Sequence, residues 1–129
     1  MIVVDTSALM AIILDEPGCE ACMAALEAND GVVISAGTMA EALIVSARRG
    51  VSGEMERLIN GLGLQIAPVT AATAHRVASA YDRWGKGVNP ASLNFGDCFA
   101  FAEAEALALP LLFVGDDFTR TDIRAALIR

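Results

Sequence analysis

The chain has 129 residues, so we expect a single domain over residues 1–129 that buries a core of its own. Apolar residues make up 55% of it, above the ordinary ~45–50%, and this surplus favours an oligomer or a constant partner protein. The net charge of −7 argues against nucleic-acid binding through overall charge, and no apolar run reaches the ~20 residues that a membrane helix needs.

The N-terminal half alternates short apolar runs with longer helical stretches. Continuous apolar runs predict buried strands, and longer runs with apolar residues on one side predict helices. Gly50 suits a helix end, and Ser52 suits the N-cap of the helix that follows. In chain order we expect a strand over 2–4, helices over 8–14 and 19–28, a strand over 32–35, and helices over 38–49 and 52–61.

The C-terminal half continues the alternation. Pro68 and Pro110 each mark an element boundary, and residues between 85 and 93 are rich in Gly, Asn and Pro. The tail from Thr121 fits either a last helical turn or a small edge strand. In chain order we expect a strand over 64–67, a helix over 70–84, a loop over 85–93, a helix over 96–109 and a strand over 111–114.

Strands that alternate with helices predict parallel βαβ units. Each predicted strand is a continuous apolar run, which is typical of a sheet with helices on both faces. We therefore predict an α/β fold, a three-layer α/β/α domain with a central parallel sheet of four to five strands.

Four acidic residues are predicted to lie at one edge of this sheet. Asp5 directly follows the first strand, and Asp116 comes two residues after the last. Glu41 and Asp97 each fall near the start of a helix. Ligands of open α/β sheets bind beyond the carboxyl ends of the strands, so these positions can face one cleft.

Each of these acids also has a structural role open to it. Thr38 and Glu41 have the spacing of a capping box. Asp97 suits the positive end of a helix dipole, and Asp5 can cap the helix that follows it. Asp116 fits a turn. The chemical interpretation therefore depends on all four acids together.

A divalent cation would relieve the repulsion between converging carboxylates. Ligand sets made only of oxygen favour Mg²⁺, or Mn²⁺ in its place, over zinc. Cys19 and Cys22 form one CxxC pair, but with Cys98 and a single His75 the ligands of a structural zinc site are missing. Three cysteines without a disulfide framework favour the reducing cytoplasm. An acidic metal centre can hydrolyse phosphodiester bonds.

Four segments make the pattern recognisable. They start at residues 4, 35, 94 and 115 and read VDTSA, SAGTMAEALIV, NFGDCFA and GDDFTRTDI. In this order and spacing they resemble the PIN-domain family, and within it the VapC toxins of bacterial toxin–antitoxin pairs. The resemblance spans nearly the whole chain, and the last two segments make it specific.

The resemblance implies a site as well as a fold. The first and last strands would be neighbours, and Asp5, Glu41, Asp97 and Asp116 would take the places of the family's four acids. Asp5 and Asp97 would bind the metal directly, whereas Glu41 and Asp116 would bind it directly, through water or at a second ion. Ser7 would support the site, and Asp117 would be a neighbour of it.

The resemblance further implies a Mg²⁺-dependent endoribonuclease that acts as a toxin in the cytoplasm. Its partners would be RNA, a small antitoxin protein that blocks the cleft, and a second copy of the chain, with no membrane. Because the net charge is negative, the RNA phosphates would bind to local groups of Arg and Lys side chains rather than to the protein as a whole. The candidates are Arg48, Arg49, Arg83 and Lys86.

Three alternatives to this function remain open from the residues. A nuclease that acts on DNA or on a particular nucleic-acid structure would use the same metal centre. A phosphatase would use Asp5 as a nucleophile. A catalytically silent PIN-type module would keep the fold only to bind a partner.

Overall fold

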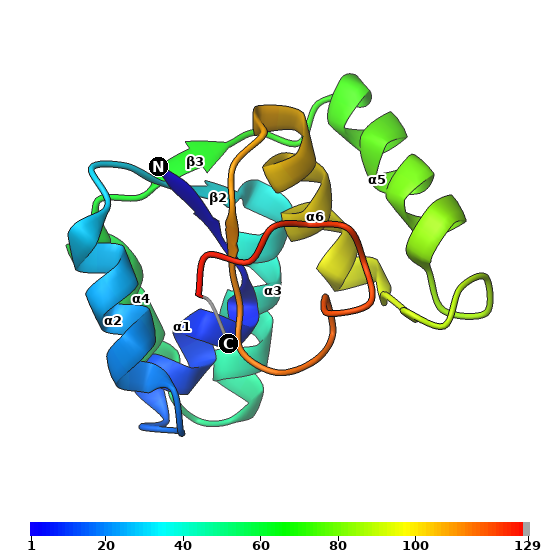
Figure 1. The fold of residues 1–129 in the computed structure, drawn as a ribbon. Helices are drawn as coiled ribbons and strands as arrows, with labels where there is room; N and C mark the ends of the chain where they lie inside the picture. Colours follow the sequence, from blue (N-terminus) through cyan, green and yellow to red (C-terminus); the bar gives the residue numbers. More distant parts are fainter. Residues whose placement is uncertain (128–129) are drawn as a thin grey trace.

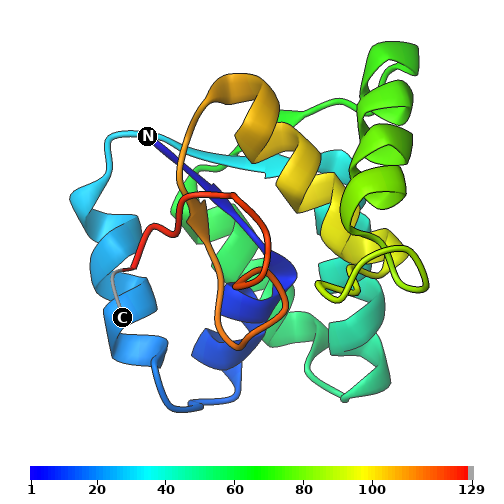
Figure 2. The same ribbon diagram turned by 45° about the vertical axis from the view of Figure 1, so that its right-hand side comes forward.

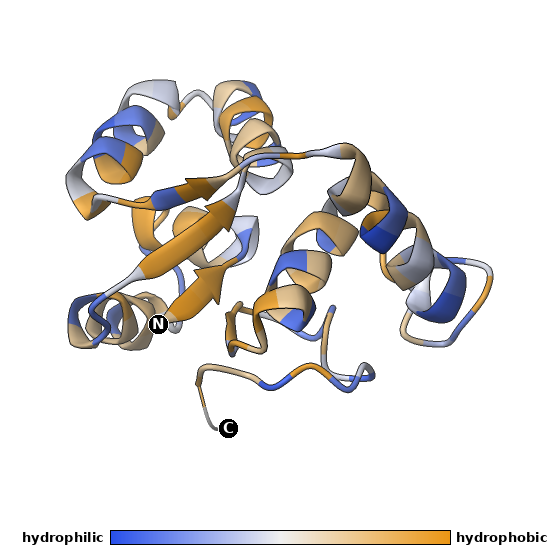
Figure 3. Ribbon diagram, turned by 90° about the horizontal axis from the view of Figure 1, so that it is seen from above, coloured by the Kyte–Doolittle hydropathy of each residue, from blue (hydrophilic) through white to orange (hydrophobic). Residues whose placement is uncertain are grey.

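The computed structural model describes residues 1–127 and holds a parallel four-stranded sheet in the order β3-β2-β1-β4 (Figure 1). The strands are β1 (Ile2–Val4), β2 (Val32–Ser35), β3 (Gln65–Ala67) and β4 (Leu111–Leu112). β3 lies at one edge and begins with the exposed Gln65, whereas β1, β2 and β4 are buried throughout. Figure 3 shows hydrophobic residues along β1 and β2 and a hydrophilic start to β3.

Six helices within residues 1–127 cover both faces of the sheet (Figures 1 and 2). They are α1 (Thr6–Ile13), α2 (Cys19–Ala28), α3 (Ala36–Arg48), α4 (Ser52–Leu62), α5 (Ala71–Trp84) and α6 (Phe95–Leu107). Ile2 and Val4 face one core together with α1 to α4, while Val3 faces the other core with α5 and α6. The predicted three-layer α/β/α arrangement is confirmed. Within residues 1–127, no helix is long and apolar enough to cross a membrane.

β1 and β4 are neighbours in the sheet, as the resemblance implied. Val3 pairs with Leu111 and Val4 with Leu112. The carboxyl ends of β1 and β4 therefore leave the sheet side by side. On the outer side of β4 the tail adds one parallel bridge, between Leu111 and Ala125, so the described part of the tail makes an edge contact.

α3 begins at Ala36, two residues before the predicted position. The hydroxyl of Ser35 accepts a hydrogen bond from Gly37 N at 3.2 Å and caps the helix there. Thr38 is therefore a buried residue inside the helix, and Glu41 stands on the second turn. The capping box of Thr38 and Glu41 is wrong, which leaves the Glu41 carboxylate for another role.

Several other boundaries differ from the prediction by one or two residues, and α1 begins at Thr6 rather than at residue 8. Val51 rather than Ser52 is the N-cap of α4, because the helical turn begins one residue earlier, so the predicted cap at Ser52 is wrong. The strand predicted over 111–114 is too long. Val114 N donates at 3.0 Å to the hydroxyl of Ser7, which takes this backbone group out of the sheet.

Candidate active site

Asp5 lies at the carboxyl end of β1 and is 3% exposed. Its Oδ2 accepts two hydrogen bonds from Ser7, one from the backbone N at 3.1 Å and one from the hydroxyl at 2.7 Å. The same hydroxyl accepts a hydrogen bond from Val114 N at 3.0 Å. Ser7 thus links the Asp5 carboxylate to the segment that leaves β4.

The other carboxylate oxygen of Asp5 has no comparable partner. Oδ1 is buried and receives no hydrogen bond from residues 1–127. Asp5 is the N-cap of α1, the structural role that the sequence predicts for it, but the capping hydrogen bond uses Oδ2 alone. Buried polar atoms are normally paired, so Oδ1 is the acceptor that a bound cation would satisfy.

Glu41 reaches from α3 toward α1 and α6. Its Oε1 accepts a hydrogen bond of 2.6 Å from the hydroxyl of Thr6, which joins α1 to α3. Its Oε2 lies against Gly96, where an added β-carbon would overlap the carboxylate. The start of α6 can approach Glu41 this closely only because residue 96 has no side chain.

Asp97 is held by the first turn of α6 and is 6% exposed. Its backbone N donates to Asn94 Oδ1 at 2.8 Å, and its Oδ2 accepts from Asn94 N at 3.0 Å. This reciprocal pair is a capping box, so Asp97 also has the structural role that its position suggested. The cap fixes the direction of the Asp97 carboxylate.

Burial and neighbouring negative charges raise the pKa values of Asp5 and Asp97. Burial, with a smaller contribution from Glu41, raises the pKa of Asp5 to about 6, although the Ser7 hydrogen bonds oppose the change. Burial also raises the pKa of Asp97 to about 7, and the charges of Asp5, Asp117 and Glu41 add to it. These acids therefore lie within one electrostatic field, and a cation among them would favour the ionised forms.

The loop after β4 carries Asp116 and Asp117, and both are exposed. The charge of Asp117 contributes to the raised pKa of Asp97, so Asp117 is a neighbour of the buried acids. Asp116 stands four residues beyond the end of β4 rather than two, because the strand is shorter than predicted. The charge effects on Asp5 and Asp97 place Glu41 and Asp117 near them, and metal binding by any of these acids, Asp116 included, stays a prediction.

This donor set fits a hard divalent cation such as Mg²⁺, which prefers carboxylate oxygens. Within residues 1–127, no three His, Cys, Asp or Glu side chains are grouped closely enough to enclose an ion. Mg²⁺ needs no such enclosure, since it is commonly bound through one or two carboxylates and keeps several waters. Asp5 and Asp97 would supply these carboxylates, and Asp5 Oδ1 is unpaired within the described chain.

The sequence profile of the PIN domain matches residues 2–124. The chain belongs to the PIN-domain family. Among its PIN-domain relatives, Ribonuclease VapC42 of Mycobacterium tuberculosis is 41% identical over 128 residues, covering 96% of this chain and 98% of that protein. Ribonuclease VapC30 of the same organism is 40% identical over 124 residues, covering 94% of this chain and 95% of the relative.

Two solved structures share the α/β PIN fold. One is Mycobacterium tuberculosis VapC20, described as a Sarcin-Ricin loop cleaving toxin, with a TM-score of 0.77, 16% identity and coverage of 95% of this chain and 96% of that chain. The other is a toxin–antitoxin complex from Klebsiella pneumoniae, with a TM-score of 0.69, 19% identity and coverage of 95% and 93%. At these identities the likeness concerns the fold alone.

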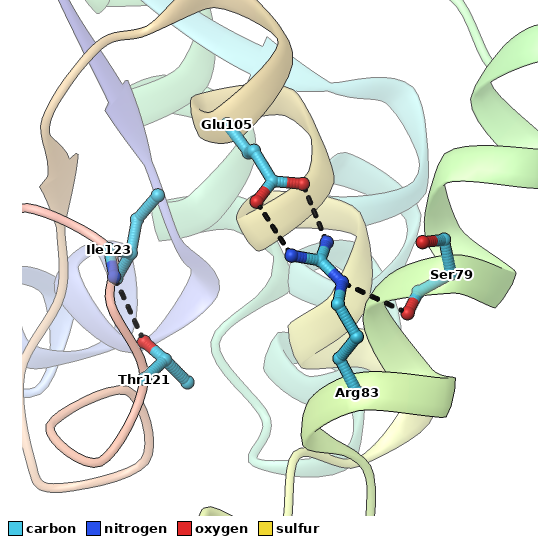
Figure 4. Close-up of polar contacts among 5 residues, drawn as sticks. All are labelled: Ser79, Arg83, Glu105, Thr121 and Ile123. Atoms are coloured by element: carbon cyan, nitrogen blue, oxygen red, sulfur yellow. Dashed lines mark hydrogen bonds and ion pairs between the residues drawn. The ribbon is translucent and has the colours of Figure 1, made fainter.

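Arg83 of this PIN domain braces α5 against α6. Its guanidinium donates two hydrogen bonds to the Glu105 carboxylate, at 3.0 and 2.7 Å (Figure 4). The guanidinium also lies over the Phe101 ring. Glu105 follows Asp97 by eight residues of α6, which is about 12 Å along the helix. The Arg83 guanidinium is therefore engaged by Glu105 at a distance from the acids, and this ion pair competes with the predicted RNA contact.

The other predicted cations are exposed. Arg48 follows Glu41 by seven residues, so it lies on the same side of α3, about 10 Å along the helix. Arg49 is the C-cap of that helix. Lys86 lines a hollow between α5 and α6, together with Asn94 from the cap of α6.

Sequence reasoning missed the contacts that position these acids. Thr6 was visible only as part of a motif, and its bond to Glu41 spans 35 positions. Asn94 could have been found, because Asn94-x-x-Asp97 has the form of a capping box. Gly96 near the start of a predicted helix is a second signal, since glycine there suggests a close approach of another group.

Proposed function

We propose that this PIN domain is a metal-dependent endoribonuclease that hydrolyses RNA phosphodiester bonds and acts as the toxin of a toxin–antitoxin pair. The observation that carries the proposal is the buried pair of Asp5 and Asp97, with an unpaired oxygen on Asp5 within the described chain. Relatives about 40% identical over nearly the whole chain bear the name VapC ribonuclease, which supports the same activity.

Asp5 and Asp97 would hold Mg²⁺, or Mn²⁺ in its place, and Glu41 and Asp116 would bind it directly, through water or at a second ion. The ion would supply Lewis-acid stabilisation of the scissile phosphate and lower the pKa of an attacking water. Ser7 holds Asp5 Oδ2, which leaves Oδ1 as the oxygen that would bind the ion. The hydroxyl of Thr6 holds Glu41 Oε1, and Glu41 Oε2 would accept the proton of the water.

The proposal includes two protein partners. The neighbouring acids on a chain of net charge −7 suit a small antitoxin that presents a basic side chain. A structure of the same fold is described as a toxin–antitoxin complex, which supports such a partner. The apolar surplus supports a homodimer, and the cysteine content supports a cytoplasmic location. Light scattering of the purified protein tests the dimer.

Cleavage of total bacterial RNA by the purified protein, in Mg²⁺ and in EDTA, tests the activity. Discrete products that require Mg²⁺ are expected, and mapping their ends would identify the target. A single-stranded DNA in the same buffers is the control for substrate class. Cleavage of DNA alone would contradict the ribonuclease. Absence of both cleavage and Mg²⁺ binding would replace it with the silent binding module.

A further inference from the structure

Phe95 is a large apolar side chain that the fold does not bury. It is the first residue of α6, two positions before Asp97, and it is 69% exposed. An exposed phenylalanine contributes little to the hydrophobic core. Its place beside the buried acids therefore requires a reason other than packing.

The Phe95 ring is held in a defined position. Phe99, one turn further along α6, meets it edge to face with ring centres 5.0 Å apart and planes at 87°. Phe99 in turn lies against Gly37 of α3, where a β-carbon would overlap its ring. The capping box between Asn94 and Asp97 fixes the backbone on both sides of Phe95. A ring fixed in this way loses little freedom when a ligand packs on it.

Phe95 and Phe99 together separate two hollows. One, of about 310 Å³, lies toward α3 and is also lined by Glu41 and Gly96. The other, of about 650 Å³, lies toward α5 and is also lined by Lys86. Their volumes are within the range of ligand sites. The Phe95 ring thus borders the space that Glu41 faces, with a cation on its other side.

We propose that Phe95 stacks on a base of single-stranded RNA beside the acids, and this contact rests on the proposed ribonuclease function. Single-stranded RNA exposes unstacked bases, and aromatic rings bind them with little sequence preference. On a chain of net charge −7, contacts to phosphates alone give weak attraction. Stacking supplies affinity that does not depend on charge, so this part of the binding free energy should vary little with salt.

Fluorescence anisotropy of a short labelled single-stranded RNA tests the contact in EDTA, where the proposed cleavage cannot occur. Phe95→Ala should weaken binding between about 5-fold and 150-fold, the range expected for loss of one stacked base. Phe95→Trp should keep the affinity, whereas Phe95→Leu, which keeps apolar area but has no ring, should behave like Phe95→Ala. Leu107→Ala, an exposed apolar residue at the other end of α6, is the matched control and should bind like wild type.

Three results would overturn the contact. The first is that Phe95→Leu binds RNA as tightly as wild type, and the second is that the protein does not prefer single-stranded over duplex RNA. The third is that Phe95→Ala loses oligomeric mass in light scattering but keeps its RNA affinity. The last would assign this ring to a protein interface. If the protein binds RNA through Phe95 but cuts none in Mg²⁺, the ribonuclease fails and the stacking contact stands. If the protein cuts RNA and Phe95→Leu binds RNA as tightly as wild type, the stacking contact fails and the ribonuclease function stands.

Discussion

Asp5→Asn in metal-free protein tests whether this carboxylate is as buried as the structure indicates. Burial raises its pKa from 3.8 to about 6. At 1.36 kcal/mol for each pKa unit, ionising Asp5 costs the folded protein roughly 3 kcal/mol. Because the folded pKa is the higher one, the protonated Asp5 stabilises the folded protein by this amount below about pH 4, and the stabilisation is lost as the pH rises through 6. Roughly 2 kcal/mol of it falls between pH 4.5 and 7.5.

Asparagine keeps an acceptor for both Ser7 hydrogen bonds but does not titrate in this range. The fall in the free energy of unfolding from pH 4.5 to 7.5 should therefore be about 2 kcal/mol smaller in Asp5→Asn than in wild type. Urea unfolding in EDTA, followed by circular dichroism, measures it. Asp30→Asn removes an exposed acid and should keep the wild-type fall. Equal falls in wild type and Asp5→Asn would refute the reasoning. One cooperative transition would support the expected single domain over residues 1–129.

Four further substitutions separate the positioning contacts from the surface charges. Thr6→Val removes the hydroxyl that holds Glu41 and should lower kcat by about 10-fold; an unchanged kcat in steady-state assays would contradict this. Gly96→Ala places a methyl group against Glu41, so kcat should fall and thermal unfolding should show a loss of about 1–3 kcal/mol. Arg83→Ala breaks an exposed ion pair and should cost at most about 1 kcal/mol in urea unfolding, with RNA affinity unchanged. Lys86→Ala should reduce the slope of log affinity against log salt by about 0.7, and an unchanged slope would exclude a phosphate contact.

The layers of the fold could be predicted from the sequence, whereas several boundaries could not. The apolar runs of β1 and β2 and the intervening helices were enough to predict a parallel sheet between helices. The start of α3 was misplaced because Ser35 and Thr38 are both good caps, and only the end of β2 decides between them. The end of β4 was misplaced because Val114 is apolar but gives its N–H to Ser7, which is 107 positions away.

The candidate site could be predicted as a set of acids at the edge of the sheet, but its supporting contacts could not. Asp5 and Asp97 were visible from their places beside a strand end and a helix start. Arg83 and Glu105 lie 22 positions apart on two different helices, so no local sequence pattern predicts that Glu105 pairs with this cation. The nearness of Asp117 to Asp97 depends on the path of the loop after β4, which residue spacing does not determine.

In the proposed mechanism, a metal held by Asp5 and Asp97 drives RNA cleavage. Asp97→Asn tests it most directly, because the amide oxygen can still accept from Asn94 N and keep the capping box, while the charge is lost. Mg²⁺ binding by calorimetry and RNA cleavage rates are measured for wild type and Asp97→Asn side by side. We expect a folded variant with weakened Mg²⁺ binding and a cleavage rate reduced by about 100-fold or more. Wild-type cleavage by Asp97→Asn would contradict the account.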